Sequence, residues 1–253
     1  MAINLKALRK TSIIRPPRMV VYGTHGVGKS SFAAQAPSPV YIQTEEGLDA
    51  LNVTAFPLAR SYEEVMEAIQ SLYSEDHEFK TVVLDSADWL EKLIFKQVAV
   101  NNKVTNIEDI GYGKGYGFAV DLWHNIIEGF DLLRNEKGMG VIMLAHTQIK
   151  RYDDPLSDSY DRYMLDLHKG GASIISEWCD LLMFANYRVS TVKSDIGFNQ
   201  KKTRAVGVGE RVLHTQERPG WVAKSRWPLP DTMPLDYEQF STALTTAMNP
   251  KGE

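Results

Sequence analysis

The sequence GTHGVGKSS occupies residues 23–31 and directly follows the apolar run Met19–Tyr22. It matches the pattern G-x-x-x-x-G-K-[ST], in which glycines allow backbone N–H groups to point at phosphate oxygens. The match has the context that such a loop requires, because an apolar strand precedes it and a helical pattern over residues 29–36 follows it. The stretch therefore predicts a phosphate-binding loop at the beginning of an α/β fold.

We expect Lys29 to reach the β- and γ-phosphates of a nucleotide, and the Ser30 hydroxyl to bind Mg²⁺. Asp85 ends the apolar run Thr81–Leu84 and is predicted to hold the metal as well; the alternative is that it caps the following helix. The expected cofactors are thus ATP and Mg²⁺, with Ser30 and Asp85 as the metal ligands. The predicted nucleotide-binding residues are Gly23, Thr24, His25, Gly26, Val27, Gly28, Lys29, Ser30, Ser31 and Asp85.

The composition of the 253-residue chain is that of a globular protein, with 43% hydrophobic and 24% charged residues. Its formal net charge of −4 does not imply a nucleic-acid partner, although a local basic surface is compatible with one. The single cysteine, Cys179, excludes an intrachain disulfide and fits a reducing compartment. Because the sequence contains neither a membrane-spanning apolar run nor a signal peptide, we expect a cytoplasmic protein with no membrane partner.

Apolar strands alternate with helical patterns along the chain, which predicts an α/β fold with a mostly parallel, twisted sheet flanked by helices. The expected strands are residues 19–22, 40–42, 53–58, 81–84, 140–145 and 179–185, and the expected helices are 29–36, 62–73, 87–100, 118–133 and 236–248. Residues 204–214 and 221–226 predict a C-terminal β-hairpin extension. Two long polar stretches, 101–117 and 150–171, are expected to be loops, and such loops usually carry function or are disordered.

Polar residues also follow other predicted strands, at the carboxyl edge where parallel sheets bind ligands. Glu45 and Glu46 follow the strand at 40–42, and one of them is a candidate general base for water; the alternative is an exposed acidic turn. Gln148 follows the strand at 140–145 and is a candidate sensor of the γ-phosphate. His146 could act in the same way or only cap the strand.

Taken together, four of these stretches resemble the core of RecA-type recombinases, and more closely the small phage RecA-like single-strand annealing proteins. They are residues 23–30, 41–49, 82–86 and 146–150. The resemblance implies that Glu45 is the catalytic glutamate and Gln148 the sensor. It also implies that a neighbouring subunit completes each ATP site with basic residues, for which Lys224 and Arg226 are the candidates. The alternative for these two is a surface strand with alternating charges.

The resemblance further implies a phage-encoded ATPase, active in the host cytoplasm, that binds single-stranded DNA and anneals complementary strands. Such a protein would form a ring or filament, with a single-strand-binding protein as a further partner. The two long loops would then contact DNA through stacking and charge. The candidate DNA-binding residues are Tyr112, Lys114, Tyr116, Lys150, Arg151 and Arg162, and a separate basic cluster is Lys201, Lys202 and Arg204. Several aspartates in the second loop oppose phosphate binding.

We expect a basic N-terminal arm at residues 1–17, a RecA-like ATPase core at 18–230, and a C-terminal helix and tail at 231–253. Since no further large domain accompanies the core, annealing is favoured over full strand exchange. Alternative functions are a P-loop kinase, with residues 150–171 as a substrate lid, and a RecA-like helicase or motor acting on another substrate. A GTPase is disfavoured because the sequence lacks an N-K-x-D motif.

Overall fold

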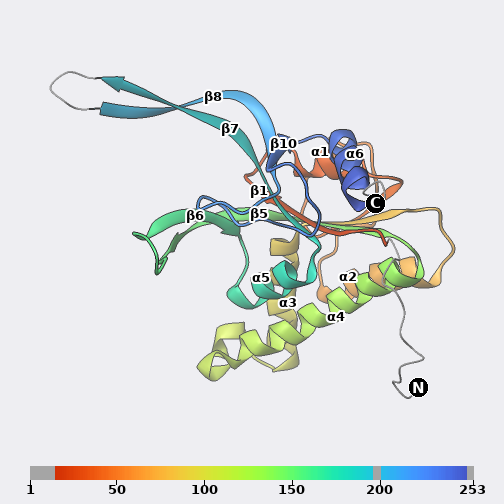
Figure 1. Ribbon diagram of the computed structural model, residues 1–253. Helices are drawn as coiled ribbons and strands as arrows, with labels where there is room; N and C mark the ends of the chain where they lie inside the picture. The colour runs from red at the N-terminus through yellow and green to blue at the C-terminus, as the bar shows by residue number, and fades with distance from the viewer. Residues whose placement is uncertain (1–14, 196–200, 250–253) are drawn as a thin grey trace, which may run out of the picture.

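The computed structural model describes residues 15–195 and 201–249, and it describes side chains outside residues 189–208. A single sheet forms the centre of the molecule (Figure 1). Its strands are β1 (Arg18–Gly23), β2 (Pro39–Gln43), β3 (Thr54–Ala55), β4 (Thr81–Asp85), β5 (Gly140–Tyr152), β6 (Tyr160–Leu165), β7 (Leu181–Asp195), β8 (Lys201–His214), β9 (Lys224–Ser225) and β10 (Thr232–Pro234). The helices are α1 (Lys29–Ala33), α2 (Tyr62–Ser74), α3 (Ala87–Asn101), α4 (Lys114–Glu136), α5 (Lys169–Trp178) and α6 (Tyr237–Met248), with short 3₁₀ turns η2 (Ile107–Asp109) and η3 (Gly111–Gly113).

The strand order across the sheet is β10-β8-β7-β1-β5-β4-β2-β3. All neighbours from β7 to β3 are parallel, whereas β8, β9 and β10 are added in antiparallel fashion, and β6 pairs antiparallel with β5. The prediction of a mostly parallel α/β sheet flanked by helices is therefore confirmed. Strand β1, which leads into the predicted phosphate-binding loop, lies in the middle of the sheet between β5 and β7.

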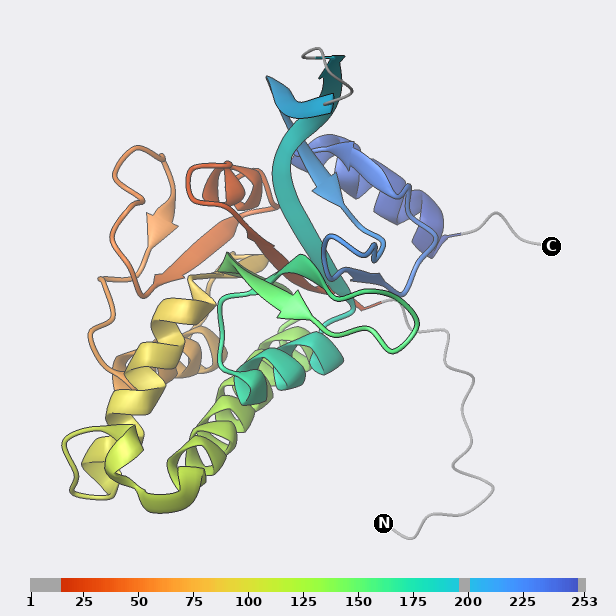
Figure 2. The same cartoon turned by 90° about the vertical axis from the view of Figure 1, so that its left-hand side faces the viewer.

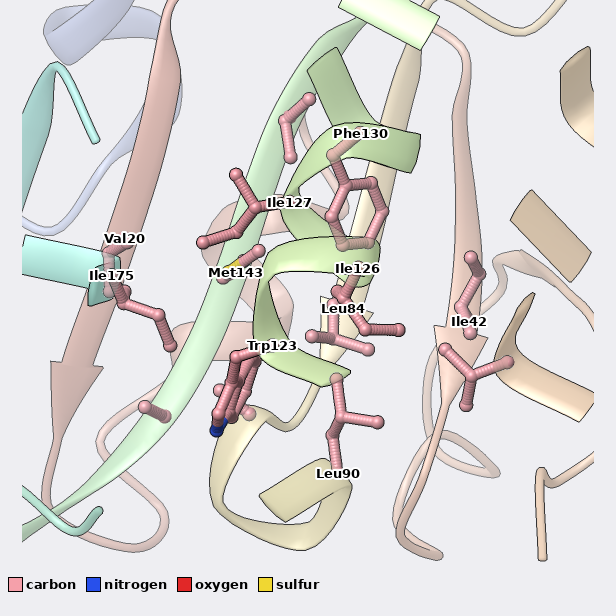
Figure 3. Packing of buried hydrophobic residues seen from close by; sticks show 14 of the residues in the cluster. Val20, Ile42, Leu84, Leu90, Trp123, Ile126, Ile127, Phe130, Met143 and Ile175 are labelled. Carbon is pink, nitrogen blue, oxygen red and sulfur yellow. The ribbon is translucent and has the colours of Figure 1, made fainter. Parts of the chain in front are cut away.

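Helices cover both faces of the sheet, as the continuous apolar strands require. Helices α2, α3, α4 and α5 lie on one face, and α1 and α6 lie on the other (Figures 1 and 2). The alternation of side chains along β1 shows the two layers, since Val20 and Tyr22 face the larger core while Met19 and Val21 face the smaller one. In the larger core, Trp123 of α4 is almost fully buried among strand and helix side chains (Figure 3).

Two antiparallel hairpins extend the sheet beyond its helical cover. Strand β5 continues past the core and turns back as β6, and β7 continues and turns back as β8 (Figure 1). The loop predicted at 150–171 is therefore wrong in part, because the stretch contains the end of β5, the whole of β6 and the first turn of α5. Residues 153–159 and 166–168 are the parts that do form loops. The predicted hairpin partners are also wrong, because β8 pairs with β7, while β9 is short and pairs with the beginning of β7.

The five predicted helices are present, with the largest differences at the ends of α1 and α4, and α5 is a helix that was not predicted. Helix α1 ends at Ala33, before the predicted end, and its last turn tightens through a bond from the Gln35 N–H to the Phe32 carbonyl. Helix α4 begins at Lys114, so part of the loop predicted at 101–117 is helical. In the part of the chain that the structure describes, no helix is long and apolar enough to cross a membrane. The expected basic arm lies almost entirely outside the described residues.

An ion cluster joins the elements at the amino edge of the sheet. Asp180, just before β7, pairs with Arg18 at 2.9 Å, Arg134 at 3.5 Å and Arg226 at 2.9 Å. Although burial alone would raise the pKa of Asp180, the hydrogen bonds and charge of Arg18, followed by the charge of Arg134, hold that pKa below its ordinary value. Asp180 thus ties β1, α4 and the segment after β9 to the beginning of β7.

We predict that Asp180→Asn lowers the free energy of unfolding by about 3 kcal/mol at neutral pH, because the arginines lose their buried partner. Since the pKa of Asp180 is lowered on folding, its contribution is complete above the unfolded value of about 4 and is lost as the pH falls through the folded value. Urea unfolding of both proteins at several pH values measures this difference. Asp158→Asn, an exposed position, is the control, and a difference that did not shrink in acid would contradict the assignment.

Candidate nucleotide-binding site

Three parallel strands, β1, β2 and β4, end side by side at one edge of the sheet, and β5 continues beyond them into the β5–β6 hairpin. In the register of β1 and β5, Gly23 lies opposite His146, and in that of β2 and β4, Gln43 lies opposite Asp85. Glu45 follows β2 after Thr44. The structure thus brings the predicted phosphate-binding loop to the same edge as the acidic residues that the sequence singled out.

The phosphate-binding loop is held in shape by its glycines and its lysine. Gly26 and Gly28 have φ values of 72° and 105°, in the left-handed region that favours glycine. The Lys29 ammonium is buried and donates to the carbonyls of Gly23, at 3.1 Å, and Thr24, at 3.2 Å. Burial lowers the pKa of Lys29, while the charges of nearby carboxylates, Asp85 first, oppose this. The loop therefore presents backbone N–H groups and a buried cation together.

Ser30 and Asp85 lie in direct contact. The Ser30 hydroxyl donates to Asp85 Oδ2 at 2.6 Å. Burial raises the pKa of Asp85, against the hydrogen bond from Ser30 and the charge of Lys29. A hydroxyl and a carboxylate are oxygen donors of the kind Mg²⁺ takes, and this ion usually keeps several waters and binds substrate phosphates. The pair fits Mg²⁺ in that mode, since the described residues contain no cluster of three or more His, Cys, Asp or Glu that could hold a metal by themselves.

Thr44 sets the position of Glu45, and sequence reasoning did not identify it. Its backbone N–H donates to the Asp85 carbonyl at 2.8 Å, and its hydroxyl donates to the Ser86 carbonyl at 2.7 Å and accepts from the Ser86 N–H at 2.9 Å. These bonds join the ends of β2 and β4, and Glu45 follows directly. Burial raises the pKa of Glu45, whereas Glu46 is exposed.

His146 connects the loop to helix α3. Asp88, in the first turn of α3, accepts from the His146 backbone N–H at 2.9 Å, and its other oxygen lies 3.0 Å from Nδ1 of the ring. These hydrogen bonds lower the pKa of Asp88, although burial alone would raise it. The ring of His146 stacks on His25 of the loop at 3.9 Å, and its Nδ1 is 3.9 Å from Glu45. Asp88 therefore orients His146 through two hydrogen bonds.

Gln148, the predicted sensor, is attached to the β5–β6 hairpin. Its side-chain amide donates to the carbonyls of Leu165, at 2.8 Å, and Leu167, at 3.3 Å. In this arrangement, the amide fixes the end of β6 against β5. Because Gln148 lies only two residues after His146 on the same strand, a movement of this strand end would shift both side chains.

The predicted DNA-contacting residues fall into three settings. Tyr112 and Lys114 are exposed around η3 and the beginning of α4, and Tyr116 stacks on His168 at 4.1 Å. Lys150 and Arg151 are exposed on the outer part of β5. In contrast to the exposed contact that we expected, Arg162 is buried and bonds to Glu217 at 2.7 Å, so its side chain joins β6 to the segment before β9.

Lys224 and Arg226 lie at the edge of the sheet opposite the phosphate-binding loop, since Lys224 pairs with Leu182 near the beginning of β7. Lys224 donates to the carbonyls of Ser176 and Glu177 at the end of α5, at 2.8 and 3.1 Å. Arg226 pairs with Asp180, but its side chain is 53% exposed. Neither residue lies at its own chain's loop, so a role there requires a neighbouring subunit.

The central strand with its phosphate-binding loop, and the carboxylate at the end of β4, define a P-loop protein. The sequence profile of a family described as an AAA domain matches residues 15–227, and the chain belongs to this family of P-loop ATPases. The SPbeta prophage-derived uncharacterized protein YorG of Bacillus subtilis (strain 168) is 22% identical over 134 residues, which cover 51% of this chain and 40% of YorG. The chain thus spans less than half of that relative's length.

A comparison of structures gives a further likeness. The crystal structure of the RadB recombinase is similar with a TM-score of 0.44 and 14% sequence identity, over 79% of this chain and 80% of that one.

We predict that Thr44→Val lowers the free energy of unfolding by about 2 kcal/mol, because it leaves the buried Ser86 N–H without a partner. The Ser86 carbonyl loses one bond but still accepts from the Leu90 N–H. Valine has nearly the same shape as threonine, so little packing is lost. Chemical denaturation measures the change, with Thr54→Val on the exposed edge strand β3 as the matched control. Equal stability of the two variants would contradict the bridging role of Thr44.

Proposed function

We propose that this protein hydrolyses ATP and binds single-stranded DNA, and that it promotes the annealing of complementary strands in phage recombination. The observation that supports this most is the convergence of Lys29, Ser30, Asp85 and Glu45 at one sheet edge, beside the hairpin that continues β5. Family membership supports the ATPase part. The similarity to a prophage-derived protein supports a phage origin.

In the proposed reaction, Glu45 accepts a proton from the attacking water. Its raised pKa suits a general base, because a carboxylate closer to neutrality takes a proton more readily. The Lys29 ammonium, which now donates to the carbonyls of Gly23 and Thr24, would donate to phosphate oxygens instead and offset the phosphate charge. Ser30 and Asp85 would hold Mg²⁺, which neutralises phosphate charge when bound. His146, held by Asp88 and next to Glu45, keeps that carboxylate oriented toward the loop.

The proposed DNA contacts use exposed aromatic and basic side chains. Tyr112 is fully exposed and Lys114 is exposed beside it, so that a base could stack while a phosphate is paired. Lys150 and Arg151 on the β5–β6 hairpin add positive charge, although Arg151 also lies 3.6 Å from Asp153. A single strand would then contact both segments.

Assembly into a ring or filament is proposed from the positions of Lys224 and Arg226. They lie at the amino edge, and the phosphate-binding loop lies at the carboxyl edge. A head-to-tail contact between copies would bring one edge against the other, which is the geometry that builds rings or helical filaments. Arg226, with its half-exposed guanidinium, is the better candidate for a contact with a neighbour's nucleotide. A single-strand-binding protein is a further proposed partner.

The hydrolytic part is tested with substitutions at the sheet edge. Lys29→Ala is expected to abolish ATP binding, whereas Glu45→Gln is expected to retain binding and to lose turnover by about 100-fold or more, the usual contribution of a general base. Glu46→Gln, next to Glu45 but exposed, is the control. Because the pKa of Glu45 is raised, kcat should fall with decreasing pH in a range above that of an ordinary glutamate. Normal turnover of Glu45→Gln would exclude Glu45 as the base.

The DNA part is tested with variants at the two ends of α4. We predict that Tyr112→Ala weakens binding of single-stranded oligonucleotides by about 1–3 kcal/mol, the contribution of one stacked base. Lys114→Ala should weaken binding and flatten its salt dependence, because one phosphate contact contributes a slope of about 0.7 for single strands.

Lys137→Ala, at the opposite end of the same helix, is the matched control for Lys114→Ala. Fluorescence anisotropy at several salt concentrations measures affinity, and ATP turnover with and without oligonucleotide measures stimulation. If single strands neither bind nor change the rate of hydrolysis, the chain is an ATPase that acts on another substrate.

A further inference from the structure

The β7–β8 hairpin begins against the phosphate-binding loop, at residues that the sequence did not single out. Tyr187 on β7 and Arg211 on β8 are partners across the hairpin, so their side chains leave the same face of the two strands. The Tyr187 hydroxyl donates to the carbonyl of Gly26 at 3.2 Å. The base of the hairpin is therefore attached to the loop by a hydrogen bond.

Arg211 lies over the next glycine of that loop. A Cβ atom built on Gly28 would be 2.6 Å from Arg211 Nη1 and 3.7 Å from Arg211 Cδ. The guanidinium is thus in contact with the residue that directly precedes Lys29. The φ of 105° favours glycine at position 28, and the absence of a Cβ atom there leaves the space that the guanidinium occupies.

The charge of Arg211 is available for a ligand. No carboxylate of the described side chains lies within ion-pair distance of it, and the side chain is exposed. The neighbouring Arg188 differs, because its guanidinium pairs with Glu210 at 3.0 Å. Of these two arginines at the base of the hairpin, it is Arg211 that lies against the phosphate-binding loop.

We propose that Arg211 contacts the phosphate chain of the bound nucleoside triphosphate, as a cation supplied by the same chain. This proposal rests on the ATP-binding function proposed above and adds a residue from outside the parallel part of the sheet. A guanidinium remains charged at all relevant pH values, and its planar donors match phosphate oxygens. Because Lys224 and Arg226 are at the opposite edge, Arg211 could act in a monomer, whereas they could not.

The test compares Arg211→Gln, Arg211→Lys and Arg188→Gln in the full chain. A fluorescent ATP analogue measures the dissociation constant at protein concentrations low enough to keep the chain monomeric, and steady-state hydrolysis measures KM and kcat. Arg211→Gln should raise the dissociation constant about tenfold, which corresponds to about 1.4 kcal/mol. Arg211→Lys should recover part of this loss because it keeps the charge, and Arg188→Gln should remain within about twofold of the natural protein.

Thermal unfolding without nucleotide distinguishes binding from folding. Equal melting temperatures of Arg211→Gln and the natural protein, together with weaker ATP binding, support the phosphate contact. A lower melting temperature with no rescue by lysine would assign Arg211 a structural role and overturn the proposal. If the natural protein binds ATP and Arg211→Gln binds it equally well, only the role of Arg211 fails. If the natural protein and Arg188→Gln both fail to bind ATP, the proposed ATPase function is wrong, and the role of Arg211 is wrong as well.

Discussion

The parallel register of β1, β2, β4 and β5 is the constraint on which the rest of this structure depends. Because these strands run in the same direction, and β1, β2 and β4 end where β5 leaves the core, residues far apart in the sequence meet at one edge of the sheet. The Thr44 hydroxyl holds two of those ends together, and the contact of Ser30 with Asp85 joins helix α1 to the end of β4. Without this parallel alignment, the residues of the candidate site would lie far apart.

Most of the fold could be predicted from the sequence, because the core strands are continuous apolar runs and the helices have regular apolar spacing. The hairpins could not be predicted in this way. The outer end of β5 is exposed and β6 is mostly half-buried, so their residues need not be apolar. The aspartates and tyrosines of 150–163 are as typical of a loop as of a solvated strand. Backbone pairing, which leaves no signal in composition, decides their structure.

The candidate site was predictable to the extent that each residue follows a strand or belongs to a motif. Glu45 and Asp85 could be identified because carboxyl ends of parallel strands meet, and the structure brings both near Lys29. Thr44, Asp88 and Arg211 could not, since their importance comes from contacts with other elements. Lys224 and Arg162 were predicted to bind a ligand because they are basic. In the structure, Lys224 instead bonds to the Ser176 carbonyl and Arg162 to Glu217, both in the same chain. Residue type alone does not show whether a charge is already paired.

The second hairpin is a continuous extension of a core strand, and this has a mechanical consequence. From Tyr187, which is bonded to the loop at Gly26, strand β7 runs to Asp195, a span of about 26 Å at about 3.3 Å per residue. A small tilt of this strand at Tyr187 becomes a displacement of several ångströms at Asp195. Occupancy of the loop could therefore be transmitted to a distant neighbour without any rearrangement of the packed interior.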